Sequence, residues 1–233
     1  MTNRSMRQMY LDMLDGIEPD FLLQYSYGRN PYSRRDPLTM GLSPSIVRSR
    51  EGGKDIWGVH YVANRESGFA FIPEPGNFIL DDITKWRDVI KAPDLSHVDW
   101  EQLAKKDMAA ARQRGVDPTQ SAMAFHIHGG YFQTLMAFMG FVEGLCAIQE
   151  EPEEVYALFD YLCNFYNDIA EKCIDYYKPD LVQITDDVAA WGAPFVSPAQ
   201  YRELIKPFQV RDAKCGNDRG LHLVSRKIGR AHV

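Results

Sequence analysis

Residues 181–187 read LVQITDD, an apolar segment that ends in two adjacent aspartates. Its length and composition predict a buried strand. A helical pattern precedes it over residues 152–178 and another follows over residues 197–215, while similar apolar segments recur at residues 122–127 and 220–225. Strands therefore alternate with helices along this half of the chain. Such alternation is typical of parallel βαβ units, so we expect an α/β fold with a parallel sheet.

The N-terminal half predicts a different mixture of elements. Helical patterns cover residues 5–16, 99–114 and 131–148. Residues 21–25 have the composition of a buried strand, and the Arg-, Pro-, Gly- and Ser-rich residues 26–44 predict a long loop. Three β-forming segments separated by turn residues predict a small sheet near residues 46–72, at 46–50, 56–63 and 69–72.

The composition excludes several classes of protein. The chain has 233 residues, of which 45% are hydrophobic and 25% charged, and its net charge is −6. This acidic balance argues against a general nucleic-acid binder, and no segment reaches the roughly 18 apolar residues that a membrane-spanning helix needs. The first residues lack a secretory pattern, and the four cysteines form no CxxC pair. We therefore expect a cytoplasmic protein with buried thiols and with neither nucleic-acid nor membrane partners.

The two aspartates are the first candidates for a catalytic role. In a parallel barrel the active site lies at the carboxyl ends of the strands, which is where Asp186 and Asp187 stand. Side chains alternate along a strand, so only one of the two should face the barrel axis. A carboxylate there could bind a cationic group, act as a base or orient a metal ligand. The alternative is an aspartate that caps a helix or a loop.

His126 and His128 lie on one face of another predicted strand. Their spacing suits a metal site, and hence a metal-dependent hydrolase, but a strand that opens into a polar cleft would show the same pattern. We assign both to substrate binding and assign no metal ligand. Gly130 then opens a helix at Tyr131, where free N–H groups could hold an anion. We assign Tyr131 to substrate binding as well, with a core position as the alternative.

The predicted loop of residues 26–44 supplies two further candidates. Arg29 lies in it and Tyr25 directly precedes it. A guanidinium and an aromatic ring could together clasp an acidic or aromatic small-molecule substrate. The alternative is a solvated basic loop.

Several segments carry a resemblance to a known family. DIWGV at 55–59 is similar to a "D-x-W-G-v" motif, and residues 83–93 resemble the "l…w…kaPd" that follows it. The most specific match is residues 184–207, where ITDD, FVSP and YRELIKP resemble "i.DD…fiSPe.yrefikPy". Over about residues 5–225 the chain resembles the uroporphyrinogen decarboxylase superfamily, which also holds corrinoid- and coenzyme M-type methyltransferases.

The resemblance implies a (β/α)8 TIM barrel, of which this chain holds about the N-terminal half, with a small β excursion near residues 46–72. Residues 228–233 (IGRAHV) read like a translated sequencing adaptor, ATC GGA AGA GCA CAC GTC. We therefore expect residues 1–226 to be the barrel fragment and residues 227–233 a non-native tail. We expect the fragment to be inactive, and its unpaired edge strand at 220–225 to favour aggregation or a homodimer.

The resemblance also implies what the intact enzyme does. The porphyrin-binding branch carries an arginine-rich MRQAGR signature, from which residues 24–29 (QYSYGR) differ. We therefore expect a methyltransferase, which transfers a methyl group to a thiol or from a corrinoid; the alternative is a carboxy-lyase that decarboxylates uroporphyrinogen in porphyrin biosynthesis. The methyltransferase branch binds zinc through an HxC motif and a later cysteine, which this chain does not contain. Zinc and a corrinoid protein partner are thus implied only for the intact protein, with no cofactor in this chain.

Overall fold

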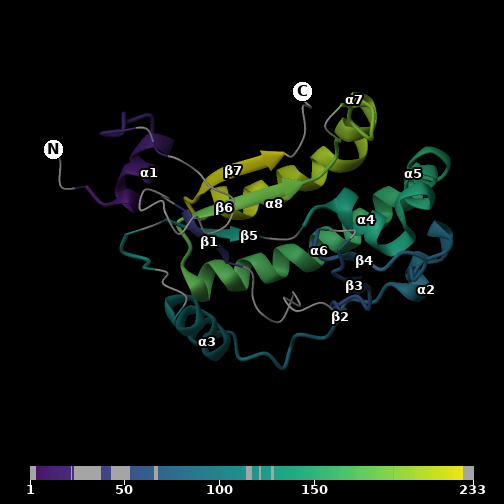
Figure 1. Cartoon of the computed structure of the whole chain (residues 1–233), viewed down its shortest axis with the longest axis horizontal. Helices are drawn as coiled ribbons and strands as arrows, with labels where there is room; N and C mark the ends of the chain where they lie inside the picture. Colours follow the sequence, from purple (N-terminus) through teal and green to yellow (C-terminus); the bar gives the residue numbers. More distant parts are fainter. Residues whose placement is uncertain are drawn as a thin grey trace.

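The computed structural model of the chain describes residues 4–21, 23, 38–42, 53–65, 68–113, 117–120, 122–126, 129–190 and 192–227, with the backbone alone for residues 38–42 and 225–227. It is a mixed α/β structure with two small sheets, and neither sheet is closed within these residues. Figure 1 shows the larger sheet with its strands pointing the same way and helices packed beside it.

Four parallel strands form the larger sheet. They are β1 (Leu38–Leu42), β5 (Ala122–His126), β6 (Leu181–Asp186) and β7 (His222–Lys227). Their order across the sheet is β1-β5-β6-β7, and every neighbouring pair is parallel. The prediction of parallel βαβ units is therefore confirmed. Because the order in space follows the order in the chain, each connection leads to the adjacent strand of the sheet.

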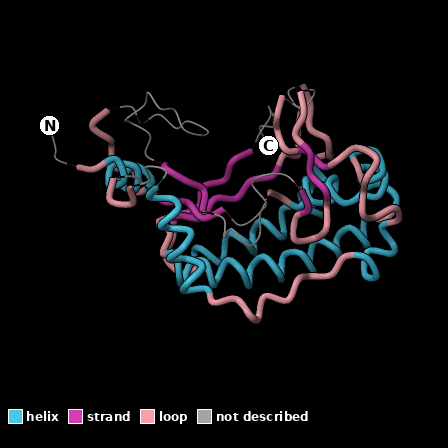
Figure 2. The backbone as a smooth tube through the Cα atoms, turned by 60° about the horizontal axis from the view of Figure 1, so that its bottom comes forward, coloured by secondary structure: helices cyan, strands magenta, loops and turns pink. Residues whose placement is uncertain are grey.

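Long helices make the connections between these strands. The long ones are α3 (Trp100–Gln113), which precedes β5, α6 (Pro152–Tyr177) and α8 (Lys206–Asn217). The short α7 (Pro198–Gln200) and a π-helical segment η2 (Tyr201–Ile205) lead directly into α8. Pro152 occupies the first turn of α6, and Ser197 and Gln200 form a capping box at the start of α7. Figure 2 shows the long helices on one side of the sheet.

The strand side chains divide between the two faces of the sheet. Phe125 of β5 and Val182 and Ile184 of β6 are buried in the main core with the helices. Residues at alternate positions, including Ala124 and Leu181, belong to a second cluster with Tyr10, Leu11 and Leu14 of α1 (Met6–Leu14). A strand alternates its side chains between faces, so His126, Gln183 and Thr185 lie on the face opposite the long helices. We call this the open face of the sheet.

A three-stranded antiparallel sheet follows β1 in the chain. It consists of β2 (Gly53–Lys54), β3 (His60–Val62) and β4 (Ile72–Pro73), and it is followed by η1 (Ile83–Lys85) and α2 (Trp86–Val89). The indole of Trp57 donates to the hydroxyl of Tyr166 at 2.8 Å and so attaches this excursion to α6. The predicted small sheet is therefore present, but only β3 lies within the segment 56–63 and only Ile72 of the segment 69–72 is in a strand. The strand β2 was not predicted, and residues 46–50 lie outside the described residues.

The structure has a strand where the sequence predicted a loop. Phe21 and Leu23 lie outside any strand, and the other residues of 21–25 are not described. The strand that pairs with β5 is instead Leu38–Leu42, within the predicted loop. It is short, it contains a glycine, and its register shifts between Leu38 and Met40. Turn-forming residues flank it on both sides, so its β pattern is hard to see in the sequence.

The predicted helix at 131–148 is two helices. They are α4 (Tyr131–Met139) and α5 (Phe141–Glu150), which bend by 114° about Gly140. Gly140 has a φ of 86°, and a Cβ there would come within 2.7 Å of the Phe78 ring. Both the backbone conformation and the close ring therefore require glycine. Among the described helices none alone is long and apolar enough to cross a membrane; only α4 and α5 taken together meet that test of length and composition.

Candidate functional site

Asp186 ends β6 and caps α4. Its carboxylate is 2% exposed and accepts the backbone N–H of Phe132 at 3.1 Å and that of Gln133 at 3.3 Å. The first N–H groups of a helix lack partners within the helix, and a carboxylate satisfies them while it also opposes the positive end of the helix dipole. Asp186 therefore caps a helix, which is the alternative to a catalytic role given in the sequence analysis. Its side chain lies on the same side of the sheet as that of Ile184.

Gly130 makes this contact sterically possible. It has a φ of 112°, and a Cβ built on it would lie 2.2 Å from Oδ1 of Asp186. No other residue type would let the backbone approach the carboxylate so closely. The contact with Asp186 is therefore sufficient to explain why a glycine precedes α4.

Asp187 lies outside the strand and is half-buried. Its Oδ2 accepts a hydrogen bond from the side-chain amide of Gln133, one turn into α4. Asp187 and α4 therefore share the carboxyl-end edge of the sheet. Asp187 is more exposed than the buried Asp186, so it is the aspartate that a ligand can reach more easily.

The open face carries a polar group at the same edge. Nε2 of His126, at the end of β5, lies 3.1 Å from the hydroxyl of Thr185 on β6. His126 is also the Cα partner of Gln183 in the sheet register. The predicted residue His126 is therefore joined on this face by Thr185 and Gln183, two residues that sequence reasoning missed. The signal that could have found Gln183 is an amide in an otherwise apolar strand.

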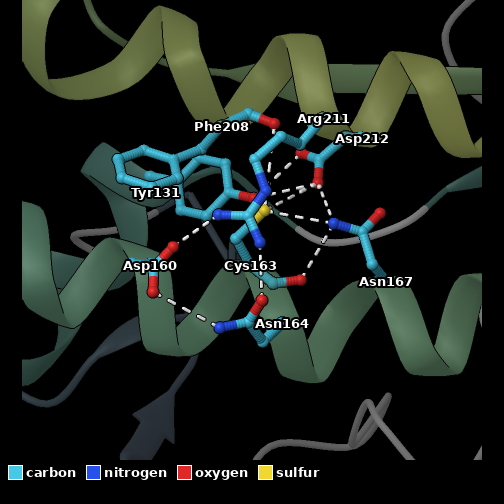
Figure 3. Close-up of polar contacts among 8 residues, drawn as sticks. All are labelled: Tyr131, Asp160, Cys163, Asn164, Asn167, Phe208, Arg211 and Asp212. Atoms are coloured by element: carbon cyan, nitrogen blue, oxygen red, sulfur yellow. Dashed lines mark hydrogen bonds and ion pairs between the residues drawn. The ribbon is translucent and has the colours of Figure 1, made fainter.

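Tyr131 lies on the other side of the sheet, buried at 1% exposure. Its hydroxyl donates to both carboxylate oxygens of Asp212 on α8, at 2.9 and 3.0 Å, and its ring packs against Phe159 and Phe208 (Figure 3). Burial, and then the nearby Asp212 charge, raise the pKa of this phenol far above its ordinary value. The structure thus places Tyr131 away from the open face, in the core position considered as its alternative.

Asp212 is the centre of a buried polar cluster that sequence reasoning also missed. Asn167 of α6 donates to it at 3.4 Å and to the backbone oxygen of Cys163 at 3.0 Å, and the Cys163 thiol lies 3.7 Å from the same carboxylate. Burial raises the pKa of Cys163 to about 12, so the thiol remains protonated. In Figure 3 Cys163 and Asn167 of α6 point toward Asp212 of α8, and beside them Arg211 of α8 contacts Asp160 and Asn164 of α6. The cluster joins these helices beneath the sheet.

Tyr25, Arg29 and His128 lie outside the described residues.

A groove of about 390 Å³ lies between residues 93–100 and α6, and it contains none of the predicted site residues. It is lined mainly by apolar side chains, among them Leu95, Trp100 and Phe165.

The residues that the structure describes contain no group of three His, Cys, Asp or Glu side chains that could hold a metal ion. Cys146 is exposed, Cys163 and Cys173 are buried and Cys215 is intermediate, and none forms a disulfide. The described part of the chain therefore offers hydrogen-bonding groups to a ligand and no ready-made zinc site.

Comparison with known proteins adds no assignment, since no protein-family model, curated protein or solved structure matches the chain.

Proposed function

We propose that the chain is the N-terminal part of a (β/α)8-barrel enzyme that binds a small molecule at the carboxyl ends of its strands. The observation that carries this proposal is the strand order β1-β5-β6-β7, in which chain order and spatial order agree. Doubly wound sheets reverse their strand order at a switch point, whereas barrels keep adding strands in the same direction. The long helices on a single side of the sheet support the same conclusion.

The reaction that we propose is methyl transfer, on the resemblance of residues 184–207 to the uroporphyrinogen decarboxylase superfamily. In this proposal Asp187, His126 and Thr185 contact the substrate. Asp186 and Gly130 are positioning residues, because they fix the start of α4 beside the edge where the substrate binds. Holding a polar substrate in a fixed geometry is a large part of the catalytic effect in such reactions.

Zinc would supply a Lewis acid that lowers the pKa of a bound thiol acceptor. The described residues do not fit this metal, because they bring no three ligands together. We therefore derive no step through zinc from this chain. Its own contribution is to bind and orient the substrate between β5 and β6.

The test uses the protein encoded by the complete reading frame. We expect zinc binding and methyl transfer to a thiol, and we expect His126→Ala to lower the turnover about 100-fold while the zinc content stays unchanged. His97→Ala is the matched control, since His97 is an exposed histidine away from this edge. Release of carbon dioxide from uroporphyrinogen, with no methyl transfer, would establish the decarboxylase instead. Loss of metal in His126→Ala would instead favour a hydrolase.

A further inference from the structure

Gln183 is a buried amide without a partner. The residue is 5% exposed and stands in the middle of β6. Within the described part of the chain no hydrogen bond is made to its side chain, and its amide atoms are not among those fully shielded from solvent. Buried side-chain amides are normally hydrogen-bonded, because an unsatisfied donor or acceptor costs free energy. Gln183 thus has no protein partner for its amide in the described residues, and solvent or a bound molecule is left to supply one.

The position of Gln183 connects it to the candidate site. It alternates with Val182 and Ile184, which are packed against the helices, so its side chain belongs to the open face. Its Cα partner on β5 is His126, and Thr185 follows it two residues later on the same face. Nearer the amino ends of the strands this face is apolar, with Leu181 and Ala124 packed on α1. Gln183 thus lies where an apolar floor meets the polar groups of the strand ends.

We propose that Gln183 is a ligand-binding residue, whose amide pairs with an uncharged planar group of the substrate such as a carboxamide or a lactam. A primary amide has two N–H donors and a carbonyl acceptor, so its best complement is a group that both accepts and donates. Neither neighbour of Gln183 in the register, His126 on β5 or Val224 on β7, carries a fixed charge. A neutral group therefore matches this position better than a carboxylate, whose burial needs a cation.

This inference rests on the proposed location of the site but not on the proposed reaction. An amide that is paired only by a ligand should strengthen ligand binding but lower the stability of the unliganded protein, as is common for binding-site residues. The sign of a stability change therefore separates a ligand-binding amide from a structural one.

The experiment compares Gln183→Met with Asn167→Leu in the protein encoded by the complete reading frame. Each substitution replaces a side-chain amide by an apolar side chain of similar size. Gln183 is buried, whereas Asn167 is partly buried and its amide N–H groups donate to Cys163 and Asp212. Only Gln183 lies on the open face. The probes are propionamide and 2-pyrrolidone, with propionate as the charged comparison. Their binding is measured by saturation-transfer NMR, and the stability of the unliganded proteins by thermal unfolding.

We expect Gln183→Met to raise the melting temperature by about 2–4 °C and to weaken the neutral probes at least tenfold. Asn167→Leu should lower the melting temperature and leave the probes unaffected. A lower melting temperature or an unfolded sample of Gln183→Met, unchanged probe binding, or tighter binding of propionate than of propionamide would each overturn the proposal. Because no turnover is measured, absence of methyl transfer would leave these results standing, and the reverse also holds.

Discussion

The hydroxyl of Tyr131 donates to both carboxylate oxygens of Asp212, and so ties the first residue of α4 to the middle of α8. Asp186 holds the next two residues of α4 through their backbone N–H groups. One end of a single helix is thus fixed by two buried carboxylates, one from a strand and one from a helix. The candidate site is built beside this fixed end.

Gly130→Ala should be strongly destabilising. The new Cβ would overlap the Asp186 carboxylate and would occupy a φ of 112° that side chains rarely adopt. We expect a loss of about 3 kcal/mol or more in the free energy of unfolding, from strain and overpacking together. Gly192→Ala is the control, because nothing lies within 4 Å of a Cβ there. Equal stabilities in urea unfolding would contradict the geometry at Gly130.

The two aspartates should differ in their effect on stability. Asp186→Ala removes a buried cap from two N–H groups, and we expect a loss of about 2 kcal/mol. Asp187→Ala removes a contact with a side-chain amide at a less buried position, and we expect less than about 1 kcal/mol. Asp187→Ala should weaken substrate binding more than Asp186→Ala does, because Asp187 is the proposed substrate contact. A larger stability loss at Asp187 would be inconsistent with the capping role of Asp186.

Tyr131→Phe and Asp212→Asn should be coupled. Removal of the hydroxyl leaves a buried carboxylate short of a donor, so we expect the single Tyr131→Phe change to cost about 1–2 kcal/mol. The double mutant should be less destabilised than the sum of the single changes, by about 1 kcal/mol. Chemical denaturation of the four proteins measures this coupling energy. Strict additivity would show that the contact contributes little.

The buried thiols should be unreactive. Alkylation at pH 8 should label the exposed Cys146 rapidly, whereas Cys163 should react only on unfolding, since burial raises its pKa to about 12. The same shift makes stability depend on pH: above about pH 9, the ordinary thiol value, the unfolded chain loses this proton while the folded protein keeps it. Cys163 therefore contributes a fall in the free energy of unfolding as the pH rises from about 9 to 12. Its replacement by serine should reduce this fall.

Much of the larger sheet could be predicted because its strands are uniformly apolar and its helices carry clear end signals. Leu181 to Thr185 reads as a buried strand, and Pro152 and Ser197 mark helix starts. The strand at Leu38–Leu42 could not be found in this way, because it is short and gains its partner only through β5. A single glycine inside an apolar helical pattern does not predict a break, and the break at Gly140 follows from its positive φ and from the ring of Phe78 packed against it.

The site was harder to predict than the fold. Two adjacent aspartates have the same local sequence, and tertiary contacts alone decide that Asp186 turns to α4. To identify Gln183 as a site residue, one has to know both that it lies in a strand and which face of the sheet the helices cover. The burial of Asp212 could have been predicted from the helical pattern. Phe208, Asp212 and Gly216 follow one another at four-residue intervals, and all three are buried on one face of α8. A charged residue on such a face points to a buried partner.

The agreement of strand order with chain order has a consequence for how the protein is made. Each strand of the larger sheet pairs with one that the ribosome has already released, β5 on β1, β6 on β5 and β7 on β6. Among the described strands only β1 has to wait for its partner, β5, to be translated. The sheet can therefore grow vectorially during synthesis, and a translational pause after any βα unit would leave its predecessors already assembled.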